Sequence, residues 1–237
     1  MVVDNFMEQQ EYRDFYSLQS QRAVQYWKET DRKDFEADLW YNRNRNEIGI
    51  NMIAEICRGK KVLSVGGGEW VETEFLEKLP VKELVRTDLI DAEGIKVADA
   101  AALPFEDNSF DVVICREVIE HVIETDPVLD EAHRVLKDGG YYFISTPNGY
   151  NTFPDGKLHR RAYTPESFIK ELKLHGFEVV DKRGDVPNIL HSLLSLSNLG
   201  FKNVLEEFKN IEAMMRISPI SYYVGTFMYV LAKKVSV

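Results

Sequence analysis

Short apolar runs alternate with helix-length segments from residue 60 to residue 183. The runs at 61–65, 83–88, 95–100, 110–117, 140–147 and 177–183 predict six strands. Between them, Thr125 or Asp126 caps a helix that "KDGG" ends, and Thr164 caps another helix that ends at Gly176. Strands that alternate with helices predict an α/β fold, a doubly wound, Rossmann-like and mostly parallel sheet with helices on both faces.

The two ends of the chain depart from this rhythm. Residues 8–57 read as helical, with a helix–turn–helix crossing expected over 34–47, and residues 185–218 read as a helical insertion. Residues 222–234 then form a long apolar run that no crossover helix separates from the insertion. We therefore expect a seventh strand that joins the sheet antiparallel to its neighbours.

Charge and cysteine content exclude several classes of function. The 237 residues carry a formal net charge of −10 with scattered lysines and arginines, whereas nucleic-acid binders usually show a basic patch. No apolar run approaches the roughly 18 residues that span a bilayer. Cys57 and Cys115 lack metal-ligand spacing and read as buried thiols of a reducing compartment. We expect a cytoplasmic protein with a small-molecule substrate, no nucleic-acid partner and no stable membrane insertion.

Three glycines follow the first predicted strand directly, in "KVLSVGGGEW". In a doubly wound sheet this turn is where a nucleotide-type ligand binds, next to the free N–H groups of the following helix. We expect Gly66 and Gly68 to adopt positive φ and to let the backbone approach the ligand. A tight turn without a ligand is the alternative.

Two aspartates lie at the ends of the next two strands. Asp88 follows Gly66 by 22 residues, a spacing typical of a carboxylate that binds ribose hydroxyls. Asp99 ends the third strand, where it can accept a hydrogen bond from an adenine amino group while the Ala100 N–H meets a ring nitrogen. Each aspartate alone also fits a turn residue. Together with the glycines, they predict one crevice at the carboxyl edge of the sheet.

These motifs resemble the class I S-adenosylmethionine-dependent methyltransferases that act on quinones, sugars and other metabolites. The similarity rests on "VLSVGGGEW", "RTDL", "ADAAALPFEDNSFDVVICREVIEHV", "EAHRVLKDGGYYFISTPN" and "YTPESFIKELKLHGFEV". It covers roughly residues 60–183 and the final strand. The resemblance implies S-adenosylmethionine as the cofactor, and its binding residues here would be Val65, Gly66, Gly67, Gly68, Asp88, Leu89, Asp99, Ala100 and Arg116.

Two residues depart from the family pattern. Ser64 stands where the family has an acidic residue, and Trp70 stands where it has a third glycine. Ser64 can still bond the amino group of the cofactor without supplying a charge. The Trp70 indole either forms a pocket wall near the cationic sulfur or packs under the first helix. A nicotinamide dinucleotide is the rival ligand, but its fingerprint requires a glycine where this chain has Val71.

The acceptor side of the site is predicted to follow the fourth and fifth strands. His121 and His159 are the candidate catalytic bases, since an imidazole titrates near neutral pH. Arg160 and Arg161 are candidates for holding a carboxylate or phosphate of the acceptor. Tyr163 lies on the same predicted loop. Structural roles in a helix turn and in a solvated loop are the alternatives.

No metal is assigned, although the resemblance leaves one alternative open. Some quinone-directed relatives are thought to use acidic and histidine groups near this point for a divalent cation, and Glu117, Glu120 and His121 would be the corresponding set. Their side chains suit a hard or borderline ion, but their spacing alone is a weak signal.

The complete expectation is methyl transfer from S-adenosylmethionine to a small molecule, at oxygen. We expect a helical cap or lid over residues 1–58 and a core over 59–237. The insertion at 185–218 is expected to serve as acceptor pocket and lid, as the interface of a homodimer or as a contact with a membrane surface. The alternatives are a non-catalytic cofactor-binding or interaction protein on the same fold and an RNA methyltransferase.

Overall fold

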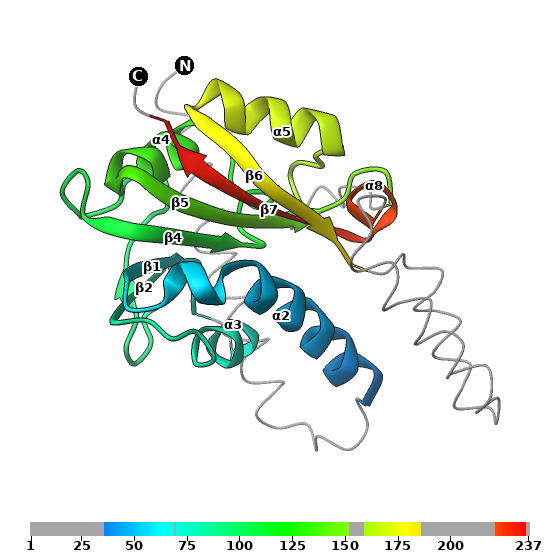
Figure 1. The fold of residues 1–237 in the computed structure, drawn as a ribbon, viewed down its shortest axis with the longest axis horizontal. Helices are drawn as coiled ribbons and strands as arrows, with labels where there is room; N and C mark the ends of the chain where they lie inside the picture. The colour runs from blue at the N-terminus through cyan, green and yellow to red at the C-terminus, as the bar shows by residue number, and fades with distance from the viewer. Residues whose placement is uncertain (1–35, 69, 152–158, 186–220, 236–237) are drawn as a thin grey trace.

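The computed structural model describes residues 36–68, 70–151, 159–185 and 221–235. Seven strands form one sheet in the order β3-β2-β1-β4-β5-β7-β6 (Figure 1). The strands are β1 (Lys61–Val65), β2 (Glu83–Asp88), β3 (Lys96–Val97), β4 (Phe110–Arg116), β5 (Leu136–Pro147), β6 (Phe177–Gly184) and β7 (Phe227–Lys234). β7 pairs antiparallel with both β5 and β6, whereas the pairs among β1 to β5 are parallel. The predicted seven-stranded sheet with a terminal antiparallel strand is confirmed.

Helices cover both faces of the sheet, as the alternating pattern predicts (Figure 1). On one face, α2 (Glu36–Cys57) and α3 (Trp70–Leu76) pack a core that includes Ile53 and Phe75, both fully buried. On the other face, α4 (Asp126–Val135) and α5 (Pro165–Leu174) pack a second core around Leu129 and Phe168. Both faces are apolar because a parallel sheet buried between helices has no side toward water.

The start of β5 lies earlier than the sequence predicts. "KDGG" was expected to end the preceding helix, but that helix ends at Val135. Leu136 already has extended backbone (φ −71°, ψ 138°) and pairs with Phe110 of β4. The side chain of Leu136 is fully buried, so this position in the sheet removes its apolar surface from water.

Two other predicted boundaries are also wrong. The helix–turn–helix crossing expected over 34–47 is not present in its described part, because α2 runs unbroken from Glu36 to Cys57. The last strand begins at Phe227, and the short helix α8 (Ser221–Val224) precedes it. The buried side chain of Asn148 donates to the carbonyls of Tyr223 and Gly225, which fixes the turn between α8 and β7.

The parallel strands place their carboxyl ends at one edge of the sheet. The glycine turn, Asp88 and the segment after Arg116 therefore meet there, as ligand-binding segments do in doubly wound folds. No helix in the part of the chain that the structure describes is long and apolar enough to cross a membrane. The expected lid segments, apart from α2 and Asp185, lie outside the described residues, so their lid and dimer roles stay predictions.

Candidate cofactor and acceptor site

The glycine turn is held by backbone hydrogen bonds to the end of β2. The N–H groups of Gly66 and Gly67 donate to the Thr87 carbonyl at 2.8 and 3.0 Å. Gly66 has φ +73°, a left-handed conformation in which a side chain is strained. The positive φ expected at Gly68 is wrong, because only Gly66 adopts it in the turn.

The chain itself fills the space beside each glycine. A Cβ on Gly66 would lie 2.2 Å from Val118 Cγ2, one on Gly67 would lie 2.7 Å from Ser64 Oγ, and one on Gly68 would lie 2.7 Å from Asp88 Oδ2. Such distances lie well inside normal van der Waals contact. The glycines are therefore required by the packing of the turn as well as by any ligand, a cause that the sequence did not reveal.

Asp88 is nearly buried, with 9% of its surface exposed, and its carboxylate organises the crevice. Its Oδ2 accepts from the Gly68 N–H at 3.0 Å, and its Oδ1 accepts from the N–H groups of Leu89 and Ile90 at 2.7 and 3.3 Å. Burial raises the pKa of Asp88, and these backbone donors oppose the rise. The turn-residue interpretation is thus correct for Asp88. Ribose binding is compatible with it because Oδ2 accepts only one of these hydrogen bonds and keeps a second lone pair.

A cavity opens between the glycine turn, the ends of β2 and β3, and the segment after β4. It is lined by Val65, Gly66, Asp88, Leu89, Ala98, Asp99, Ala100, Val118, His121 and Val122. Six of the nine predicted cofactor residues are among these, namely Val65, Gly66, Asp88, Leu89, Asp99 and Ala100. The lining combines apolar walls with two carboxylates, which suits an adenosine that presents a flat base and hydroxyl and amino donors.

Asp99 closes a tight turn at the end of β3. Its Oδ1 accepts from the Ala101 N–H at 3.0 Å, and its carbonyl accepts from the Ala102 N–H at 3.0 Å. Asp99 also lines the cavity. Its role in the turn and its predicted role in binding the ligand are therefore compatible, as they are for Asp88. The residues at this edge therefore fit the adenosine part of the expected cofactor.

Arg86 supports the glycine turn, a role that the sequence did not predict. It lies on β2 opposite Ser64 of β1. Its guanidinium donates to the Gly67 carbonyl through Nε at 2.8 Å and also through Nη2, and Nη2 donates to Thr73 Oγ1 at 2.7 Å. Burial lowers the pKa of Arg86 from its ordinary value. The arginine lies inside a strand, next to the turn that follows β1, and its partners are distant in sequence.

Arg116, a predicted cofactor residue, takes part in a buried polar network. Its Nη1 lies 3.0 Å from Glu72 Oε2, its Nη2 donates to Asn46 Oδ1 at 3.1 Å, and its guanidinium lies 4.0 Å from the centre of the Phe75 ring. Burial raises the pKa of Glu72, and Arg116 opposes the rise. Glu72 and Asn46 were missed because their partner is distant in sequence. Cofactor binding by Arg116, Gly67 and Gly68 stays a prediction.

Ser64 Oγ is fully buried and has no hydrogen-bond partner among the described residues. A hydroxyl of this kind costs free energy unless something else binds it. This observation is compatible with the predicted contact between Ser64 and the cofactor. The placement of the Trp70 side chain lies outside the described residues.

Glu117 has a strained backbone at the end of β4. Its φ of +53° is uncommon for a residue with a side chain, and such strain is often found at functional sites. Its carboxylate accepts from Ser145 Oγ at 2.6 Å and pairs with Arg45 at 3.2 Å. These contacts direct Glu117 toward β5 and α2.

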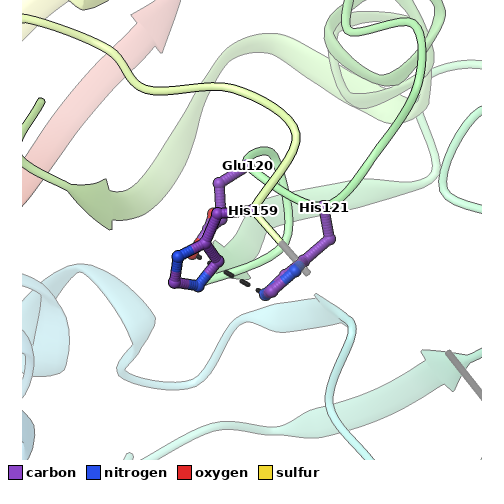
Figure 2. Close-up of side chains that lie close together, drawn as sticks. All are labelled: Glu120, His121 and His159. Atoms are coloured by element: carbon purple, nitrogen blue, oxygen red, sulfur yellow. Dashed lines mark ion pairs between the residues drawn. The ribbon is translucent and has the colours of Figure 1, made fainter. Parts of the chain in front are cut away.

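Glu120, His121 and His159 point toward one another beside the cavity (Figure 2). Glu120 Oε1 lies 3.9 Å from His121 Nε2, and the two imidazole rings are 5.0 Å apart between centroids. Glu120 is buried, and its Oε2 accepts from Thr146 Oγ1 at 3.2 Å. Burial raises the pKa of Glu120 well above its usual range, and Glu117 raises it further. The structure thus brings together both histidines that the sequence nominated as bases.

The segment after His159 only partly matches its predicted role. Arg160 and Arg161 are exposed, and their backbone N–H groups donate to the Glu120 carbonyl at 2.8 and 3.3 Å. Tyr163 is 4% exposed and packs on Phe168 in the core, so its placement on an acceptor-facing loop is wrong. Packing in the core explains the position of Tyr163 better than a contact with the acceptor does.

Comparison with known proteins agrees with this geometry. Residues 63–144 match a family model described as "Methyltransferase domain". A Mycolicibacterium smegmatis protein named "Probable S-adenosylmethionine-dependent methyltransferase" is 30% identical over 166 residues, which span 63% of this chain and only 63% of that protein. A ubiquinone biosynthesis O-methyltransferase of Cupriavidus pinatubonensis is 24% identical over 227 residues, which span 78% of this chain and 90% of that protein.

Solved structures share the fold. The crystal structure of Burkholderia thailandensis 1,6-didemethyltoxoflavin-N1-methyltransferase, with its methyl acceptor and S-adenosylhomocysteine bound, has a TM-score of 0.61 at 13% identity. The match covers 94% of this chain and 87% of that chain. Residues 63–144 of this chain therefore match a methyltransferase domain, and the chain shares the fold of this solved methyltransferase. The cavity lining described above is compatible with S-adenosylmethionine as the cofactor.

Proposed function

We propose that the protein transfers the methyl group of S-adenosylmethionine to an oxygen atom of a small-molecule acceptor. The observation that carries the proposal is the cavity in which the glycine turn, Asp88, Asp99 and His121 meet. In this arrangement Asp88 binds the ribose hydroxyls, Asp99 binds the adenine amino group, and Leu89 packs against the base. The cofactor itself supplies an activated methyl group on a cationic sulfur.

The chain has to orient the acceptor, exclude water and remove one proton. His121 lines the cavity, and His159 lies next to it, so either imidazole is placed to take the proton of an acceptor hydroxyl. Orientation of the reactants alone supplies much of the rate enhancement in such a transfer. The available bases favour oxygen as the acceptor atom, and the likeness to a ubiquinone biosynthesis O-methyltransferase supports the same choice.

We place the activity in the cytoplasm, because the two cysteines are free and buried, as expected in a reducing compartment. The formal net charge of −10 favours a small molecule over RNA as the acceptor. We also propose that the segments of 1–58 and 185–218 outside the described residues close over the crevice, or that the insertion forms a homodimer interface.

A transfer assay with methyl-labelled S-adenosylmethionine and fractionated extracts tests the proposal. We expect label in a small-molecule fraction, and the bond to oxygen would be identified by mass spectrometry of the product. Label in RNA alone would support the RNA alternative. Binding of S-adenosylhomocysteine without transfer to any fraction would support a non-catalytic protein.

The catalytic base is tested separately by comparing His121→Gln with His159→Gln. Loss of a general base lowers kcat by roughly a hundredfold or more, so the variant with the larger fall in kcat identifies the base. His175→Gln is the matched control, because His175 is not among the residues that line the cavity and it pairs with Asp130 of α4. Equal kcat values in all three variants would contradict a histidine base.

A further inference from the structure

A second groove lies between the edge strand β6 and the helix α5, which runs alongside it (Figure 1). The groove has a volume of about 490 Å³ and is lined by residues of α5, β6 and α8. It shares no lining residue with the cofactor cavity. We propose that this groove, the α5–β6 groove, binds an extended acidic peptide segment of a partner protein, which adds a strand to β6.

The outer edge of β6 supplies main-chain hydrogen-bonding groups. β6 is the last strand in the sheet order and pairs with β7 alone among the described strands. Its ladder with β7 is irregular between Val179 and Asp181 and regular from Asp181 to Gly184. The Lys182 N–H donates to the adjacent Asp181 carboxylate at 2.8 Å, a local bond that a peptide carbonyl can replace. A strand edge without a neighbouring strand is where an extended segment adds to a sheet.

The exposed side of α5 forms the apolar wall of the α5–β6 groove. Ile169, Lys170, Lys173 and Leu174 line the groove, and their positions along α5 place them on one side of the helix. Leu174 is 69% exposed, which leaves a large apolar side chain in water. Alternate side chains of a strand point to the same side, so every second residue of a peptide bound along β6 would face this wall. Covering Ile169 and Leu174 therefore favours binding.

The α5–β6 groove is positively charged, although the whole chain carries a formal net charge of −10. Lys170, Lys173 and Lys182 line it, and none of the three forms a salt bridge within the described residues. The carboxylate in the lining, Glu166, accepts a hydrogen bond from the Tyr150 hydroxyl at 2.8 Å. Complementary charge selects an acidic partner. A peptide fits better than an anionic membrane, because a membrane surface would also repel the acidic remainder of the chain.

The Lys182 ammonium is held in place where the groove meets α8. Its Nζ donates to the Tyr223 hydroxyl at 3.0 Å and lies 5.0 Å from the centres of the Tyr222 and Tyr223 rings. Tyr222 in turn donates to the Pro165 carbonyl at the start of α5, so Lys182 lies on the side of β6 that faces α5. An ammonium that is already positioned loses less side-chain entropy when it binds a carboxylate. Lys182 therefore marks the expected position of one acidic side chain of the peptide.

Fluorescence anisotropy of the full chain with a fluorescein-labelled peptide of four Glu-Val repeats tests the proposal. We expect saturable binding that weakens as the salt concentration rises from about 50 to 300 mM. A Lys-Val peptide of the same length should bind at least about tenfold more weakly. N-methylation of one or the other alternate set of amides in the Glu-Val peptide should weaken binding at least about tenfold, because it removes the N–H groups that pair with β6. None of these measurements depends on the proposed methyl transfer.

Substitution of two groove lysines by glutamine tests where the peptide binds. Lys170→Gln combined with Lys173→Gln should weaken binding of the Glu-Val peptide by about three- to tenfold. Lys78→Gln combined with Lys82→Gln is the matched control, because both lysines are exposed, neither lines the groove, and the change in net charge is the same. This control should leave the affinity unchanged. Circular dichroism of each variant checks that it is folded.

Several results would overturn the proposal. Absence of saturable binding, equal binding of the N-methylated peptides, or equal weakening in the groove and control variants would each do so. Light scattering of the chain alone would also overturn it if it showed a dimer that only the groove variant dissociates, because a second copy would then occupy the groove. Sedimentation with phosphatidylserine vesicles that depends on the groove lysines, without binding of the peptide, would show a membrane contact instead.

Discussion

Substitution of Gly66 by alanine tests the packing of the glycine turn quantitatively. The new Cβ would meet two penalties, because Gly66 has φ +73° and because Val118 Cγ2 would lie 2.2 Å away. The left-handed backbone costs an alanine about 1–2 kcal/mol. Overpacking of this kind typically costs about 1–3 kcal/mol more. We therefore expect Gly66→Ala to lower the free energy of unfolding by about 2–5 kcal/mol.

Gly94 separates the two penalties. It has nearly the same φ, +75°, but no atom lies within 4 Å of a Cβ built on it. Gly94→Ala should therefore lose only the backbone part, about 1–2 kcal/mol. The entropy that alanine removes from the unfolded chain is common to both variants, so it cancels in the comparison.

A double-mutant cycle with Val118→Ala isolates the steric part. That substitution removes Cγ2 and leaves the Val118 Cβ at 3.6 Å from the added atom, an ordinary contact. Urea unfolding followed by circular dichroism should show that Gly66→Ala costs about 1–3 kcal/mol less in the Val118→Ala background. Additive effects within about 0.5 kcal/mol, with Gly66→Ala no worse than Gly94→Ala, would refute the packing argument.

Three further predictions concern the site and the core. Asp99→Asn should weaken binding of 5′-methylthioadenosine about tenfold, because the adenine amino group loses a charged acceptor. An unchanged affinity in calorimetric titration would count against the contact between Asp99 and adenine. A Glu120 carboxyl whose folded pKa is raised above its ordinary 4.5 contributes stability at and below about pH 4.5, and this contribution is lost as the pH rises through the folded pKa. Glu120→Gln should therefore gain stability relative to the native chain as the pH rises from about 5 to 8, whereas parallel urea midpoints over that range would contradict this sign. Burial raises the pKa of the Cys57 and Cys115 thiols to about 12. Both cysteines should therefore react with a thiol reagent at pH 8 at least about a hundredfold faster in urea than in the native state. Rapid labelling of the native protein would argue against their burial.

The fold could be predicted from the sequence because its central strands β1 and β4 are buried on both faces. Runs such as "KVLSV" and "FDVVICR" carry no alternation, and each is followed by a helix-length segment. The apolar pattern did not predict the correct element where other interactions determine the backbone conformation. Tyr222 and Tyr223 extend the final apolar run, yet they lie in α8, which Asn148 fixes from the end of β5.

The cofactor side of the site was predictable for a related reason. Ends of parallel strands meet at one edge, so Asp88 and Asp99 could be placed together from strand order alone. Contacts between distant segments could not be placed in this way. Arg45 pairs with Glu117 across the fold, and no local pattern encodes that pairing. The closeness of His121 and His159 likewise depends on how two separate segments pack.

The crystal structure of the complex with S-adenosylhomocysteine is the most direct test of the central claim. We expect the ribose hydroxyls within about 3.2 Å of the Asp88 carboxylate and the adenine amino group within the same distance of Asp99. A ligand bound at another edge of the sheet, or a crevice filled by a protein side chain with the ligand excluded, would contradict the account.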